Sequence, residues 1–178
     1  MGPHEFAQPV EPPTVGGAPV TPPWSRLPRV GRIGPIVVQS DPDGCGPACG
    51  SMLLADRGLT IAPEFIGTGL AVPCGAQALA FRLNEVCRGK WRWVGGALDT
   101  PMARGWDQVA LLTRVRGSWS ALLEPHGHRH VGHWVVVDGV SDLGVVNIRD
   151  PAGSAYGIPI EEFESLWNYG ILVLEARS

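Results

Sequence analysis

The second half of the chain is a series of short apolar segments separated by turn residues, and this pattern predicts β-strands. SDLG (141–144) joins two of the segments, which predicts a hairpin, and PIEEFESLW (159–167) predicts a short helix before the last strand. The four segments, bounded by Gly, Asp, Ser and Pro, are SWSALLEP (118–125), HWVVVDGV (133–140), GVVNIRD (144–150) and GILVLEA (170–176).

The first half carries apolar residues at helical spacing instead. Residues 46–57 place Ala48, Met52 and Ala55 along one face and stop at Gly58, which predicts a helix with a glycine stop. Three further helices are expected, a short one at 62–67, a stronger one at 76–88 and one from Thr100 to about Val115.

Helices followed by an antiparallel sheet define an α+β fold class. The N-terminus departs from this pattern, because nine of the 17 prolines lie within the first 36 residues and the apolar residues there show no periodicity. This composition predicts a proline-rich linker, extended or disordered, over residues 1–33. Compact patterning starts with PIVVQ, so we expect one folded domain over residues 34–178.

The overall composition excludes several functional classes. The formal net charge is -3 and no run of Lys or Arg stands out, so nucleic acid is not an expected partner. The N-terminus lacks the positive start and apolar core of a signal peptide, and no apolar stretch reaches the roughly 18 residues that span a bilayer. We therefore expect a soluble protein that leaves its cell, if at all, through a dedicated secretion system or inside a larger polypeptide.

Two cysteines follow the loop SDPDG one helical turn apart, and they differ in expected chemistry. Cys45 opens the helix, where free N–H groups and the positive end of the helix dipole stabilise a thiolate. Cys49 lies one turn further and is expected to pack in the core. Four cysteines are too few for a disulfide framework in a chain of this length, so free thiols are expected, with Cys74 and Cys87 buried.

A nucleophilic thiol needs a base and a group that orients the base. His133 starts the predicted strand HWVVVDGV and Asp150 ends its partner, so closure of the hairpin would bring them together. Gln39, six positions before Cys45, could donate its side-chain amide to an oxyanion, with the backbone N–H of Cys45 as the second donor. Together these residues predict a cysteine nucleophile with its supporting groups.

The motifs QSDPDGCGPAC, GHWVVVDGV and IRDPAG resemble the papain-like fold in its compact bacterial form. That form occurs in peptidase domains that process bacteriocin leaders at double-glycine sites and in papain-fold domains of bacterial polymorphic toxins. The resemblance covers residues 36–174 and implies a helical half, with the catalytic Cys at a helix N-terminus, packed on a C-terminal antiparallel sheet. By position it implies these roles: Gln39 the oxyanion residue, Cys45 the nucleophile, His133 the base and Asp150 the orienting acid.

The resemblance also implies an activity, a cysteine protease that cleaves peptide bonds by a Cys-His-Asp mechanism and needs no cofactor or metal. Its partners would be a protein or peptide substrate and a cognate immunity protein. No ATP-binding cassette or membrane segment follows in the sequence, so a secreted bacterial toxin or effector module is expected rather than a transporter-linked enzyme. Two alternatives stay open: glutamine deamidation or transglutaminase-like transfer by the same machinery, and a catalytically inactive binding module, although no catalytic group is missing.

Simpler roles stay open for individual residues. Asp150 precedes Pro151 and could form a turn, and Gln39 could cap the loop backbone. Cys45 and Cys49 could instead form a redox couple.

The remaining alternatives concern the region before and within the strand HWVVVDGV. PHGHRHVGHW holds four of the five histidines, but no cysteine or carboxylate motif accompanies them, so an exposed loop is expected rather than a metal site. His130 is an alternative base. Asp138 is expected as a strand-end turn residue, and Trp134 could shield the His-Asp pair from water.

Overall fold

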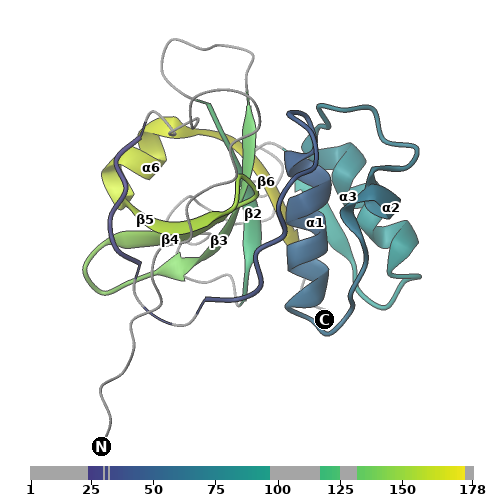
Figure 1. Ribbon diagram of the computed structural model, residues 1–178, viewed down its shortest axis with the longest axis horizontal. Coiled ribbons are helices and arrows are strands. Elements are labelled where there is room, and N and C mark those ends of the chain that lie inside the picture. The colour runs from purple at the N-terminus through teal and green to yellow at the C-terminus, as the bar shows by residue number, and fades with distance from the viewer. Residues whose placement is uncertain (1–23, 30, 32, 97–116, 125–131, 175–178) are drawn as a thin grey trace, which may run out of the picture.

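The chain folds into a helical first half and a sheet-rich second half (Figure 1). The computed structural model describes residues 24–29, 31, 33–96, 117–124 and 132–174. Its helices are α1 (Cys45–Ala55), α2 (Pro63–Gly67), α3 (Ala76–Val86) and α6 (Ile160–Leu166). Its strands are β1 (Trp93–Gly96), β2 (Trp119–Leu123), β3 (His133–Val140), β4 (Val145–Asp150), β5 (Ser154–Pro159) and β6 (Trp167–Leu174). This order confirms the predicted α+β class.

The strands form one six-stranded sheet in the order β1-β6-β2-β3-β4-β5, with every neighbouring pair antiparallel. Side chains alternate between its two faces, as strand geometry requires. In β3, Trp134 and Val136 join the core under α1 and α3, whereas Val135 and Val137 join the core that includes α6. Figure 1 shows the corresponding layers, with α1, α2 and α3 on one side of the sheet and α6 on the other.

Helix α1 is the central element of the helical half because it is buried on nearly every side. Ten of its 11 residues are buried, and its mixture of Ala, Cys, Met and Leu is apolar all round, as expected for a helix inside a core. It packs on β3 and contacts both α2 and α3. The helix ends where Gly58 adopts a φ of +80° and the N–H of Leu59 bonds to the carbonyl of Leu54, which is the predicted glycine stop.

A buried arginine ties the C-terminal end of α1 to the sheet. Arg149 of β4 is 1% exposed and donates to Asp56 just after α1, to Asp138 of β3 and to the carbonyl of Pro35. Arg29 forms a second ion pair with Asp138 at 3.1 Å. The expectation that Asp138 is a strand-end turn residue is therefore wrong, because it lies within β3 at a register shift and forms ion pairs with both arginines.

Most predicted elements within the described ranges are present. The helices expected at 46–57, 62–67, 76–88 and 159–167 are found as α1, α2, α3 and α6, and the SDLG turn joins β3 to β4. The helix expected from Thr100 to Val115 lies outside the described residues. Strands β1 and β5 were not predicted, because WVGG and SAYGIP contain Gly and Pro and lack a run of β-branched residues.

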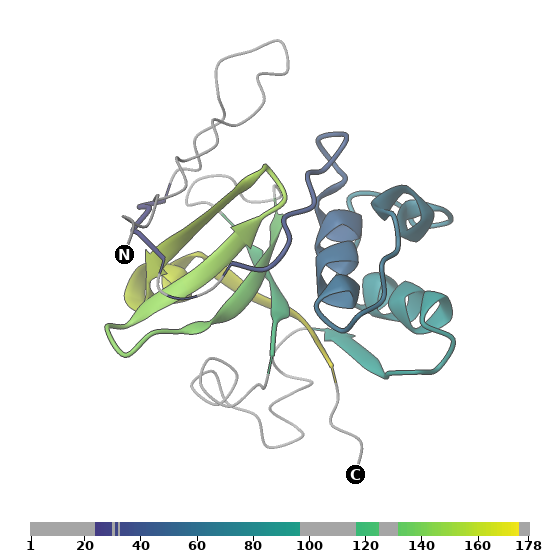
Figure 2. The ribbon, with the colours of Figure 1, turned by 60° about the horizontal axis from the view of Figure 1, so that its bottom comes forward.

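The segment before residue 30 packs on the domain, although the sequence places it in the linker. Trp24 is 6% exposed and belongs to the core on the α6 side of the sheet. Leu27 and Gly157 of β5 exchange two backbone hydrogen bonds of 2.8 and 2.6 Å. Figure 2 shows this purple segment passing over the strands before the chain reaches α1. The contacts of the folded domain therefore extend at least to Trp24, since proline-rich composition does not prevent edge pairing in an extended conformation.

The contact between β1 and α3 makes a testable prediction about Gly95. A Cβ at this position would lie 2.0 Å from the carbonyl oxygen of Ala76 and 2.6 Å from its carbonyl carbon. Because this neighbour is backbone and cannot rotate away, Gly95→Ala should lower the free energy of unfolding by about 1–3 kcal/mol. Urea unfolding measures the change. Gly75→Ala is the control, since nothing lies within 4 Å of its Cβ position, and an equal loss in both variants would contradict the packing argument.

Candidate active site

Cys45 is the first residue of α1, as the sequence predicts. It is 5% exposed, and its N-cap is Gly44, which provides no side-chain cap. No acidic residue lies in the first turn, so no carboxylate competes for the free N–H groups at this end of the helix. The start of α1 therefore places a thiol at the positive end of the helix dipole.

Gly46 explains how the residues around the thiol pack so tightly. A Cβ on Gly46 would lie 2.3 Å from Sγ of Cys74 and 3.3 Å from Cδ1 of Trp134. Trp134 in turn donates its indole N–H to the carbonyl of Cys74 at 3.0 Å. The missing side chain thus lets the start of α1 approach the start of β3, so the residues next to Cys45 and His133 lie side by side.

His133 and Asp150 are hydrogen-bonded across the β3–β4 hairpin. Val136 pairs with Arg149, and Val137 pairs with Ile148. Asp150 therefore lies two positions from the residue opposite His133, and both side chains are on the same face of the sheet. Nε2 of His133 lies 2.8 Å from Oδ1 of Asp150. The juxtaposition expected from hairpin closure is present, and because Nε2 faces Asp150, Nδ1 is the ring nitrogen left for the thiol.

The imidazole of His133 is held in its protonated form. Burial disfavours the charged ring and lowers its pKa, but hydrogen bonds and charge from Asp150 and Cys45 outweigh this effect and raise the pKa to about 10. Cys45 is thus an electrostatic partner of the ring. Because the folded protein holds this proton more tightly than the unfolded chain, the resulting stability is complete below about pH 6.5 and disappears as pH rises through about 10.

Asp150 is a fully buried carboxylate with a donor for each oxygen. Oδ1 accepts from His133 and from the backbone N–H of Ala152 at 2.8 Å, and Oδ2 accepts the hydroxyl proton of Tyr156 at 2.6 Å. Burial raises the pKa of Asp150, but these hydrogen bonds and the charge of His133 outweigh it and lower the pKa. Asp150 therefore has both roles, because Oδ1 accepts the turn hydrogen bond from the N–H of Ala152 and also bonds His133.

Gln39 lies beside the site, with its side chain turned to its own loop. Its backbone N–H donates to the carbonyl of Pro151 at 2.8 Å, next to Asp150. Its Nε2 donates to the carbonyls of Asp41 at 2.8 Å and Pro42 at 3.2 Å. Oε1 is buried and has no hydrogen-bond partner within the described residues. The structure thus shows the loop-capping contacts that the sequence left open for Gln39.

The other cysteines lie in the core. All four thiols are free, so Cys45 and Cys49 are not disulfide-bonded. Burial raises the pKa of Cys49 well above its usual value, and the charge of Cys45 adds to the shift. Burial likewise raises the pKa of Cys74 to about 11, again with a contribution from Cys45. A thiol that resists ionisation is a poor nucleophile, so neither competes with Cys45. Cys87 is also buried.

The tryptophan that packs on the His133–Asp150 pair is Trp24 rather than Trp134, and neither Trp24 nor Tyr156 was expected in the site. Trp134 points to the α1 side of the sheet, away from Asp150, because neighbouring strand residues face opposite sides. Trp24 is the tryptophan that packs on His133, with ring centroids 6.2 Å apart. Tyr156, which bonds Asp150, was also missed. No local signal marks either residue, because TPPWSRLP is proline-rich and SAYGIP matches no motif.

Of the four histidines weighed as metal ligands, His126, His128 and His130 lie outside the described residues, and His133 lies within them. Within the described ranges, no group of three or more His, Cys, Asp or Glu side chains could hold a metal ion. His133 is the histidine that the described structure places against both Cys45 and Asp150.

Solved structures with the same architecture are bacterial peptidase domains. A double glycine motif protease from an AMS/PCAT transporter, crystallised with a leader peptide, has a TM-score of 0.62 at 18% identity, over 85% of this chain and 98% of that one. A C39-like peptidase from Bacillus anthracis has a TM-score of 0.59 at 13% identity, over 81% and 95%. The peptidase domain of Streptococcus mutans ComA has a TM-score of 0.53 at 17% identity, over 79% and 98%. The chain has the papain-like fold of these domains, and identity at this level establishes the fold alone.

Sequence comparison adds a more similar relative, Cysteine protease effector 1 of Escherichia coli O1:K1:H7. It is 38% identical over 134 residues, which are 75% of this chain and 25% of that protein. The chain thus spans about a quarter of the length of this relative. No protein-family model matches the sequence.

The contacts of Asp150 predict a change in the titration of His133. Its charge and hydrogen bond raise the pKa of the imidazole, so Asp150→Asn should lower that pKa from about 10 toward the usual value near 6.5. NMR titration of the ring, assigned by its absence in His133→Gln, measures the shift. Asp142→Asn, in the exposed turn between β3 and β4, is the control. An unchanged titration in Asp150→Asn would show that the carboxylate does not set the charge of the ring.

Proposed function

We propose that this chain is a cysteine peptidase in which Cys45 is the nucleophile, His133 the general base and acid, and Asp150 the group that orients His133. The observation that carries the proposal is the position of one imidazole, which bonds Asp150 through Nε2 at 2.8 Å and interacts with the Cys45 thiol. This arrangement matches the chemical requirements of a thiol nucleophile: a base, an orienting acceptor and a helix N-terminus beneath the sulfur.

In the proposed reaction, the proton shared by Cys45 and His133 lies on His133, and the Cys45 thiolate attacks the carbonyl carbon of the scissile amide. Collapse of the tetrahedral intermediate breaks the C–N bond while His133 returns the proton to the leaving amine, leaving a thioester on Cys45. His133 then removes a proton from water, the hydroxide attacks the thioester, and the C–S bond breaks to release the acid product and restore the thiolate beside protonated His133. Asp150 keeps the imidazole oriented and stabilises its charge throughout.

The backbone N–H of Cys45 and the side chain of Gln39 are the proposed oxyanion donors. The N–H of Cys45 is available because the first N–H groups of a helix have no intrahelical partner. Nε2 of Gln39 bonds the carbonyls of Asp41 and Pro42, and the 3.2 Å bond to Pro42 is the longer of the two. We infer that a bound substrate draws one Nε2 hydrogen from Pro42 to its developing oxyanion.

Two relatives support a protein or peptide substrate and an effector role. The Escherichia coli relative bears the name cysteine protease effector, and the transporter-derived protease was crystallised with a leader peptide. We infer that this chain is the peptidase unit of a bacterial effector or toxin, delivered by a specialised secretion system or within a longer polypeptide. A producing cell would need a cognate immunity protein. Among the described residues, no helix is long and apolar enough to cross a membrane.

The proposed peptidase unit starts before the boundary that the sequence indicates. We propose that it begins by Trp24 rather than at residue 34, because Trp24 is part of the core and Leu27 pairs with β5. Residues 1–23, which contain PPTVGGAPVTPP, remain the proposed extended connection.

Substitution of the two neighbouring cysteines tests the activity. Expression of the wild-type chain in bacteria should slow growth and produce protein fragments, and Cys45→Ala should abolish both effects because the nucleophile is lost. Cys49→Ala is the matched control, four residues along the same helix, and should retain them. Growth curves and whole-proteome mass spectrometry give the readout. Target proteins that gain about one dalton without fragments would identify a deamidase instead, and effects that survive in Cys45→Ala would exclude both enzymes.

Gln39→Ala tests the oxyanion assignment. With a peptide taken from a cleaved protein as substrate, kcat should fall by about 10²–10³-fold while KM changes little, since the donor acts mainly in the transition state. Ser40→Ala, at the neighbouring exposed position, is the control. A kcat equal to that of the wild type would leave Gln39 with its loop contacts only.

A further inference from the structure

The segment 24–29 is connected to the candidate active site by a series of side-chain hydrogen bonds. Trp24 donates its indole N–H to Oη of Tyr156 at 3.0 Å, and Tyr156 donates its hydroxyl proton to Oδ2 of Asp150 at 2.6 Å. The other oxygen, Oδ1, lies 2.8 Å from Nε2 of His133. Trp24 is 6% and Tyr156 4% exposed, so water does not compete for these bonds.

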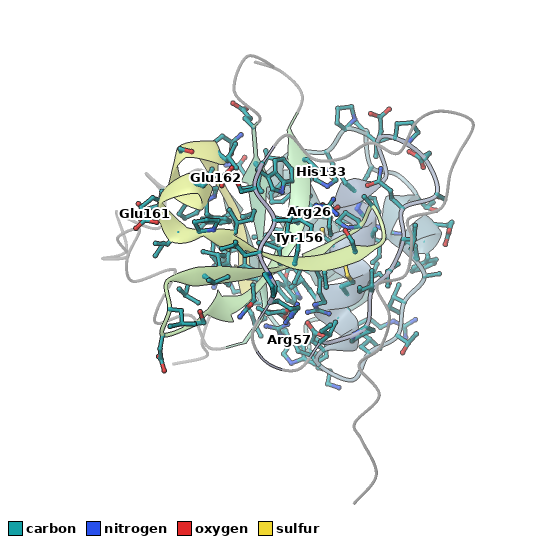
Figure 3. The ribbon with its side chains drawn as sticks, turned by 60° about the vertical axis from the view of Figure 1, so that its left-hand side comes forward. Arg26, Arg57, His133, Tyr156, Glu161 and Glu162 are labelled. Atoms are coloured by element: carbon teal, nitrogen blue, oxygen red, sulfur yellow. The ribbon has the colours of Figure 1, made fainter. Side chains whose placement is uncertain are left out.

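The same segment also contacts the rings of His133 and Tyr156. The indole of Trp24 packs on the imidazole of His133, with an interplanar angle of 30°. The guanidinium of Arg26 lies 4.4 Å from the ring centre of Tyr156. Figure 3 shows His133, Arg26 and Tyr156 near one another, with Arg57 well apart from them. Backbone pairing of Leu27 with Gly157 fixes the segment beside Tyr156.

We propose that Trp24 and Tyr156 are positioning residues for the His133–Asp150 pair, so that the N-terminal segment contributes Trp24 to the active site. This proposal rests on the peptidase function proposed above. A carboxylate can turn about its Cβ–Cγ bond, and the bonds to His133 and Ala152 hold only Oδ1. Tyr156 holds Oδ2, and the N–H of Trp24 aims the Tyr156 hydroxyl by occupying its acceptor side.

Positioning and simple charge withdrawal predict opposite results when the hydroxyl is removed. If Tyr156 only draws negative charge from Asp150, its loss would leave a stronger acceptor at Oδ1 and raise the pKa of His133. If Tyr156 positions the carboxylate, its loss lets Asp150 turn from the ring, and the pKa of His133 falls toward its usual value. The sign of the shift therefore separates the two roles.

The arrangement has a consequence for any longer protein that contains this chain. The residues that precede Trp24 are joined directly to it, and Trp24 itself packs on His133.

The test uses the full chain with Tyr156→Phe, Trp24→Phe and the double variant, each of which keeps an aromatic ring in the core. NMR titration of His133 should show a lowered pKa in Tyr156→Phe and a smaller fall in Trp24→Phe. The rate of Cys45 alkylation by iodoacetamide at pH 7 should also drop in Tyr156→Phe, because a displaced imidazolium stabilises the reacting thiolate less well. The double variant should match Tyr156→Phe, because Trp24 acts through the hydroxyl.

Leu27→Ala is the matched control, since its side chain is 36% exposed and the segment is held there by backbone bonds. It should leave titration and alkylation unchanged. A pKa of His133 that stays or rises in Tyr156→Phe, or an equal fall in Leu27→Ala, would overturn the proposal. Both measurements need no substrate, so they stand even if no peptide is cleaved; loss of growth inhibition in Cys45→Ala tests the peptidase function separately.

Discussion

The burial of α1 between the sheet and the other helices is the constraint on which the site depends. An apolar helix can be buried on nearly every side only if its neighbours approach closely, and Gly46 permits this by leaving space for Cys74 and Trp134. Arg149 holds the opposite end of the helix through Asp56. With both ends held, the first residue of α1 faces the first residue of β3, and a thiol meets an imidazole.

The opposite charges of Asp150 and His133 balance each other in a site that contains little water. The buried carboxylate of Asp150 is stable because three donors surround it, and one of these, His133, is itself a cation. A buried charge without such partners would be neutralised instead. The same pairing that satisfies Asp150 keeps His133 protonated next to Cys45. The electrostatics that stabilise this corner of the fold are thus also those that a thiolate–imidazolium pair requires.

How far the sequence predicted the structure differs between elements. The long periodic segments were predicted correctly, because a helix with one buried face such as α3 and a hairpin such as β3–β4 show their burial in the spacing of apolar residues. Strands β1 and β5 were missed because edge or Gly-containing strands owe their conformation to partners distant in sequence. The side-chain direction of Trp134 was missed for a related reason, since one position along a strand reverses the face.

The sequence by itself determined the kinds of chemical group available and which elements carry them: a cysteine at a helix start, a histidine at a strand start and an aspartate at the end of the partner strand. Local periodicity and turn chemistry are enough for this, because they act over a few residues. Only the tertiary structure decided what surrounds the pair. Trp24 and Tyr156 lie 132 residues apart along the chain, and their hydrogen bond exists because the N-terminal segment pairs with an edge strand, a contact between backbones that leaves no pattern in side chains.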